Sequence, residues 1–133
     1  MGQTFKLAAV GTVAFMVLDG LWLGVVMTNF YRDQLAPIAR LTESGGFAPN
    51  WPAALAVYVL LGVGVACFAV PGAASVGAAA LSGGLLGLVV YGVYDFTNYS
   101  TLRQWPFVLV LADVAWGVVA TAVAAAAVKL VAR

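Results

Sequence analysis

The sequence contains no histidine, one cysteine and few charged side chains. Without histidine there is no Ser-His-Asp triad, no histidine metal-ligand pair and no imidazole to act as a general base near neutral pH. The single cysteine, Cys67, cannot form an intramolecular disulfide, and we expect it to pack within the apolar run that contains it. Only 8% of the 133 residues are charged, against about 25% in ordinary soluble domains. These absences argue against a soluble protein.

Long apolar runs dominate what is present, since 64% of the residues are hydrophobic. A helix needs roughly 20 such residues to cross a bilayer, and four crossings would use most of the chain. The net charge of +1 gives no reason to expect nucleic acid as a partner, since that would call for a clustered basic face. We predict an all-α polytopic membrane protein: one transmembrane domain, residues 1–133, folded as a bundle of four transmembrane helices in two hairpins and surrounded by lipid.

The apolar segments and the turn residues between them define the predicted helices. The helices span about residues 5–27, 51–70, 74–98 and 105–128. The first is read as a retained helix because it is too long for a signal peptide, contains Asp19 and precedes no small-residue cleavage pattern. Pro71 and Gly72 mark a tight turn after the second helix. The connection 28–50 is the only sizeable one, and we expect part of it to lie on the membrane surface as a short amphipathic helix.

The second and fourth helices begin alike, with Asn50-Trp51-Pro52 and Gln104-Trp105-Pro106. Proline is tolerated in a first helical turn, and tryptophan favours the headgroup level, so both starts are expected at one membrane surface. Four crossings then place both termini at the opposite surface. The positive charges do not decide orientation, because they divide equally: Lys6, Lys129 and Arg133 on the side of the termini, and Arg32, Arg40 and Arg103 on the other.

Three aspartates interrupt the apolar runs. Asp19 lies about eight residues before the end of its helix and Asp113 about eight residues after the start of its own, so both should lie roughly 12 Å inside the same surface. Asp95 should lie closer to that surface. A carboxylate in hydrocarbon costs several kcal/mol unless it is protonated, paired or hydrated, which makes an intramembrane acid a functional candidate. We expect the three acids to face one cavity that opens toward the connection 28–50 and toward the loop that contains Arg103.

Aromatic and polar side chains accompany these acids. Trp22 follows Asp19, and Trp116 follows Asp113, at the i, i+3 spacing that places both members of a pair on one helix face. An indole N–H can donate to a carboxylate, and its ring can shield that pair or stack on a ligand. A polar stripe surrounds Asp95 at the end of the third helix. The candidate ligand or proton site therefore comprises Asp19, Trp22, Tyr91, Tyr94, Asp95, Thr97, Asn98, Thr101, Arg103, Asp113 and Trp116.

The same residues allow a purely structural interpretation. Polar side chains join membrane helices through interhelical hydrogen bonds, and each aspartate could be neutral through protonation. The ligand interpretation is favoured because three acids share one region of the membrane without an intramembrane Lys or Arg partner. Gly20 with Gly24, and Gly83 with Gly87, have the small-xxx-small spacing of close helix contacts, within the chain or in a homodimer.

Several motifs resemble a known family of membrane proteins. They are Asp19-Gly20-Leu21-Trp22-Leu23-Gly24, Phe30-Tyr31, Tyr94-Asp95-Phe96-Thr97-Asn98, Thr101-Leu102-Arg103 and Asp113-Val114-Ala115-Trp116-Gly117. Across nearly its whole length the chain is similar to the domain-of-unknown-function 2177 (DUF2177) family. The resemblance implies a bacterial inner-membrane protein with four helices, and it implies no activity.

The functional hypothesis is a small proton- or cation-coupled transporter or ligand-binding protein with an intramembrane carboxylate and aromatic site. A structural or accessory membrane protein is the first alternative. An aspartate-based lipid-modifying enzyme is the second, since paired carboxyls in a poorly solvated pocket can divide into acid and base roles. No catalytic residue can be assigned. No nucleotide-binding loop or histidine ligand is present, so we expect no cofactor and no metal site.

Overall fold

Helices account for most of the structure, a computed structural model that describes residues 1–132. Arg133, which entered the charge comparison, lies outside the described residues. The elements are α1 (Gly2–Leu21), the π-helical segment η1 (Trp22–Val26), α2 (Thr28–Leu35), α3 (Trp51–Gly64), the π-helical segment η2 (Val65–Ala69), α4 (Val76–Thr101) and α5 (Phe107–Val131). Four continuous helices are long and apolar enough to cross a membrane: Gly2–Val26, Trp51–Ala69, Val76–Thr101 and Phe107–Val131. The predicted all-α bundle of four membrane helices is confirmed.

Local sequence explains where these helices begin. The Asn50 side chain accepts a hydrogen bond from the Ala53 backbone N–H at 3.2 Å, and Pro52 occupies the first turn of α3. Ser75 caps α4 in the same way, accepting from the Ala78 N–H at 3.1 Å. Such caps satisfy N–H groups that have no partner within the helix. Gly72, with a φ of 76°, supplies the left-handed residue of the short turn between α3 and α4.

The first membrane helix ends in a π-helical turn before the chain leaves as α2. The Met27 N–H donates to the Trp22 carbonyl at 2.7 Å, and the Thr28 hydroxyl donates to the Leu23 carbonyl at 2.6 Å. A π turn adds one residue and changes the direction of the side chains that follow. The connection 28–50 therefore begins with a short helix, α2, which carries Tyr31 back toward the bundle.

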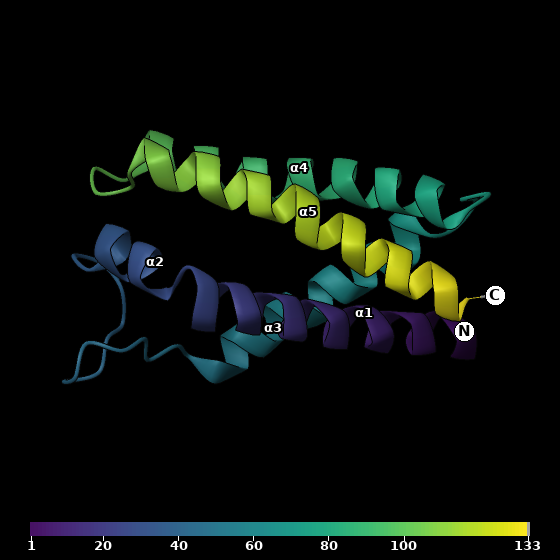
Figure 1. The fold of residues 1–133 in the computed structure, drawn as a ribbon, viewed down its shortest axis with the longest axis horizontal. Helices are drawn as coiled ribbons and strands as arrows, with labels where there is room; N and C mark the ends of the chain where they lie inside the picture. Colours follow the sequence, from purple (N-terminus) through teal and green to yellow (C-terminus); the bar gives the residue numbers. More distant parts are fainter. Residues whose placement is uncertain (133) are drawn as a thin grey trace.

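The four membrane helices form two hairpins, α1 with α3 and α4 with α5 (Figure 1). The hairpins meet mainly where α1 packs on α5 and where η2 packs on α4 and α5. Both termini lie at the same end of the bundle, opposite α2 and the long connection (Figure 1). Large apolar side chains are exposed on the outside of every membrane helix, as expected for a surface that contacts lipid.

Glycines allow the closest helix crossings. A Cβ on Gly62 would lie 2.5 Å from the Ala8 carbonyl oxygen, and a Cβ on Gly83 would lie 2.5 Å from the Ala125 Cβ. Gly87 is packed against the Gly117 carbonyl. Gly83 and Gly87 thus join α4 to α5 within one chain. Gly20 and Gly24 do not share this role, because no atom lies within 4 Å of where their Cβ atoms would be.

The hydrophobic core occupies the half of the bundle that contains the termini. Phe15, Val65 and Val128 are fully buried there, together with alanines of α5. Small α5 residues let α1, η2 and α4 approach that helix closely. The other half, toward the long connection, encloses a cavity instead.

Candidate functional site: an acid-lined cavity between the hairpins

A cavity of about 750 Å³ lies between the two hairpins in the half opposite the termini. Its walls come from α1, η1, α2, the connection after α2, α3, α4, the α4–α5 turn and α5. Three residues of the predicted site line it directly, namely Asp19, Tyr94 and Asp113. Ligand pockets commonly measure about 300–1,000 Å³, so the space suits a small organic molecule.

Asp19 of α1 is held by an aromatic donor from another helix. Its Oδ1 accepts a hydrogen bond of 2.7 Å from the Trp116 indole Nε1 on α5. The Tyr58 side chain on α3 lies close to the same carboxyl. The residue is 8% exposed, and that exposed part faces the cavity. The acid is therefore oriented by an aromatic donor while it remains accessible from the cavity.

Asp113 is held by a tyrosine that sequence reasoning did not select. The Tyr31 hydroxyl on α2 donates to Asp113 Oδ1 at 2.7 Å, and the Trp22 Nε1 donates to the Tyr31 oxygen at 3.2 Å. Burial raises the pKa of Tyr31 above its ordinary value, and the neighbouring Asp113 carboxylate raises it further. The phenol therefore stays protonated and remains a hydrogen-bond donor.

The two indoles connect the acids across the hairpins. Trp22 and Trp116 stack in parallel, with ring centroids 4.4 Å apart and an interplanar angle of 2°. Trp116 of α5 donates to Asp19 of α1. Trp22 of η1 donates to Tyr31, which in turn donates to Asp113 of α5. The i, i+3 spacing indicated only that each acid and its nearby indole share a helix face. The structure adds that each indole serves the acid of the other helix.

Asp95 lies behind Asp113 and does not line the cavity. It is fully buried, and its Oδ1 accepts a 3.2 Å hydrogen bond from the Trp105 Nε1. Its Oδ2 is buried without a hydrogen-bond partner among residues 1–132. The Asp113 carboxyl lies within hydrogen-bonding reach. Two ionised carboxylates only accept, so a hydrogen bond between Asp95 and Asp113 requires a proton on one of them.

Two other predicted residues lie beside the acids. Tyr91 packs on Gly117, where α4 crosses α5. Tyr94 meets Trp105 edge to face at a centroid distance of 5.8 Å. These contacts make Tyr91 part of the helix packing and Tyr94 part of the cavity wall.

The remaining predicted residues do not join the acids. Asn98 is half-buried and lies near the Tyr94 hydroxyl. Thr97, Thr101 and Arg103 are exposed, and the Thr101 hydroxyl donates to the Thr97 backbone carbonyl at 2.8 Å. The structure thus places these four residues at or beyond the edge of the aromatic and acidic cluster.

Three aromatic residues were missed as members of the site. Trp105, which the sequence predicts as an interfacial anchor, also donates its indole N–H to Asp95. Tyr31 entered the sequence argument only within the Phe30-Tyr31 motif. Tyr58 had a usable signal, since it carries the only hydroxyl in the predicted helix 51–70. A polar group alone on a membrane helix is expected to face the bundle interior.

The charges around the cavity have one predominant sign. Its lining contains two acids and one basic residue, Arg40, which comes from the long connection. No cluster of three or more residues with metal-ligating side chains occurs in the described part of the chain. The arrangement can therefore offer carboxyl oxygens, phenol hydroxyls and aromatic faces to a ligand.

A family model matches nearly the whole length of the chain. The family model described as "Predicted membrane protein (DUF2177)" matches residues 4–130. No curated protein and no solved structure matches the chain.

Proposed function

The chain belongs to the DUF2177 family of predicted membrane proteins, and we propose that it binds a small cationic or hydroxyl-bearing molecule within the bilayer and transports it. The observation that carries the proposal is the cavity of about 750 Å³ that reaches both Asp19 and Asp113. Both acids are oriented by aromatic donors on other helices. A bacterial inner membrane is the proposed location, because helical bundles rather than β-barrels are typical of that membrane.

Charge and ring geometry favour a cation. Positive groups are attracted both to carboxylates and to the faces of aromatic rings, more strongly where water is scarce. Tyr31, Tyr58 and Tyr94 line the cavity together with the two acids. An organic amine fits this donor set better than a metal ion, since a hard metal cation needs several converging oxygen ligands.

Asp95 supplies a site for a proton near the ligand. Its carboxyl is shielded from the cavity and lies beside Asp113. The Asp95 Oδ2 atom has no partner in the described chain, and a proton shared with Asp113 would give the buried carboxyl a second hydrogen bond. A cation bound at Asp113 favours the charged form of that acid, so binding and the position of the proton are coupled. This is the physical basis for proposing proton-coupled transport.

A structural role is the second candidate, and one observation favours it. The Trp116–Asp19 and Tyr31–Asp113 hydrogen bonds each join separate helices. Under this alternative the acids stabilise the bundle and need no ligand. The two functions differ in whether the charge or only the acceptor oxygen matters.

Replacing both cavity acids by asparagine separates the candidates. Asparagine retains an oxygen that accepts from Trp116 or Tyr31, but it carries no charge. We expect Asp19→Asn with Asp113→Asn to lower butylamine affinity at least tenfold in phosphatidylcholine nanodiscs, measured by tryptophan fluorescence. Proteoliposomes should show a matching loss of amine-driven proton flux.

The exposed Asp33 of α2 provides the control, since its only ion pair within residues 1–132 is a 3.7 Å surface contact with Arg32. Asp33→Asn should change neither affinity nor flux. If the double variant stays folded and binds and transports as the wild type does, the transport proposal is wrong.

A further inference from the structure

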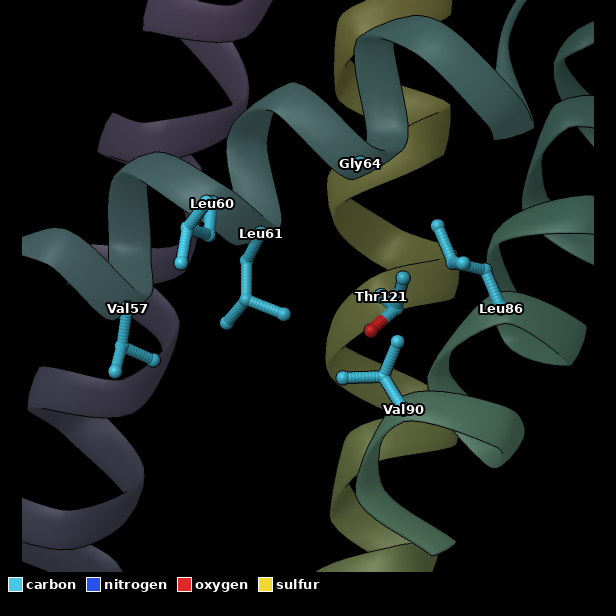
Figure 2. A pocket seen from close by; sticks show the side chains of 7 residues that line it. All are labelled: Val57, Leu60, Leu61, Gly64, Leu86, Val90 and Thr121. Carbon is cyan, nitrogen blue, oxygen red and sulfur yellow. The ribbon is translucent and has the colours of Figure 1, made fainter. Parts of the chain in front are cut away.

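A second, apolar space lies along the bundle from the acid cavity. It has a volume of about 270 Å³ and opens between α3 and the α4–α5 hairpin. Figure 2 shows Val57, Leu60 and Leu61 of α3 on one side, with Leu86 and Val90 of α4 facing them across the gap. We call this space the α3–α4 groove.

The α3–α4 groove lies next to the acid cavity along α3 and α4. On α3, Ala54 and Tyr58 line the acid cavity, and Leu61, three residues further, lines the groove. On α4, Val90 lines the groove and Tyr94, one turn further, lines the acid cavity. Residues at i, i+3, i+4 and i+7 share a helix face, so the same face of each helix borders both spaces.

Packing explains why this gap stays open. The α3 helix packs on α1, whereas contact with α4 and α5 is made mainly by η2 at its end. From Ala54 to Gly64 the α3 helix extends about 15 Å. The same faces of α3 and α4 therefore border first the acid cavity and then an apolar space in the membrane interior, and no described residue lines both.

Building on the proposed function, we propose that the ligand is a single-chain amphiphile with a small amine head. The amine lies at Asp19 and Asp113, and the hydrocarbon chain lies in the α3–α4 groove. A short soluble cation would occupy the acid cavity and leave the apolar groove empty. A phosphate head would be repelled by two carboxylates and attracted by Arg40 alone among the residues that line the cavity. The polar end and the apolar end of the space therefore both match this class of molecule.

Blocking the α3–α4 groove tests binding of the ligand's hydrocarbon chain separately from binding of its amine head. Val90→Phe enlarges a side chain that faces Leu61 across the groove. Val89→Phe is the matched control, because Val89 is 61% exposed and lines neither space. We expect Val90→Phe to weaken dodecylamine binding at least fivefold and to leave butylamine binding unchanged. Val89→Phe should alter neither value in phosphatidylcholine nanodiscs, monitored by tryptophan fluorescence.

The outcomes distinguish this inference from the proposed function. Suppose that the aspartate variants lose butylamine affinity but Val90→Phe binds dodecylamine normally. The proposed amine site is then supported, and the placement of the hydrocarbon chain in the α3–α4 groove is wrong. Should Val90→Phe fold poorly, Val57→Phe on the opposite wall replaces it. If dodecyl phosphate binds as tightly as dodecylamine, the proposal that the ligand has an amine head is wrong. A second copy in the groove would appear as a dimer that Val90→Phe dissociates, and this would overturn the amphiphile.

Discussion

At the scale of single residues, the site depends on aromatic donors that orient carboxyl groups. Tyr31 both donates to Asp113 at 2.7 Å and accepts from Trp22 at 3.2 Å, so one hydroxyl connects an acid to the stacked indoles. A buried acceptor that loses its donor costs about 1–3 kcal/mol, which exceeds the usual net gain from a hydrogen bond. The hydroxyl of Tyr31 is therefore the most informative single group to remove.

We predict that Tyr31→Phe lowers the free energy of unfolding by about 1–2 kcal/mol at pH 8, because Asp113 and Trp22 both lose a partner. The folded-state pKa of Tyr31 is raised by burial, so its stabilisation is complete below the unfolded value of about 10. It is lost as the pH rises above that value. Denaturation in detergent from pH 8 to 11 should therefore show the wild type approaching the variant at high pH.

Tyr99 provides the control for that measurement, since it is 48% exposed and its hydroxyl makes no hydrogen bond in the described residues. Tyr99→Phe should change stability by less than about 0.5 kcal/mol. A Tyr31→Phe protein as stable as the wild type at pH 8 would remove Tyr31 from the account of how Asp113 is held.

At the scale of helices, glycine positions decide which pairs approach closely. Sequence spacing selected Gly20 with Gly24 and Gly83 with Gly87 equally, yet only the second pair is packed within the chain. The spacing places small residues on one face, but it does not say which helix that face meets. The difference arises because Gly20 and Gly24 line the cavity, where no neighbouring helix packs against them.

We predict that Gly87→Ala destabilises the α4–α5 hairpin by about 1–3 kcal/mol, because its Cβ would collide with the Gly117 carbonyl. Gly92→Ala, on the same helix, is the control. No atom lies within 4 Å of its added Cβ, and alanine favours helix over glycine by about 1 kcal/mol. Thermal melting in detergent should lower the midpoint for the first variant only. Equal midpoints would show that the α4–α5 crossing tolerates a wider separation.

Helix composition also sets how much of the fold could be predicted. Apolar runs of membrane length and the Asn50 and Pro52 start signals were enough to predict four membrane helices. The π-helical turns could not be predicted, because Trp22–Val26 and Val65–Ala69 have apolar sequences that suit an ordinary α-helix equally well. The turn at Trp22–Val26 precedes α2 and Tyr31. Because this turn could not be predicted, the sequence did not show that the Tyr31 hydroxyl donates to Asp113.

At the scale of the whole molecule, the protein has a packed half and a hollow half. Phe15, Val65 and Val128 fill the half with the termini, whereas the half near the long connection contains the acids and the cavity. Helical rise predicted that Asp19 and Asp113 lie at similar depth. It could not predict that Trp116 reaches across to Asp19, since that contact depends on how the two hairpins pack.

The central claim is that the space between Asp19 and Asp113 holds a ligand rather than a dry, hydrogen-bonded core. A cryo-EM or crystal structure in lipid, with dodecylamine added, tests it most directly. We predict an elongated density with its head against both carboxyls and its tail between Val57 and Val90. Closed hairpins with the acids bonded only to protein side chains, and no density between them at saturating amine, would contradict the claim.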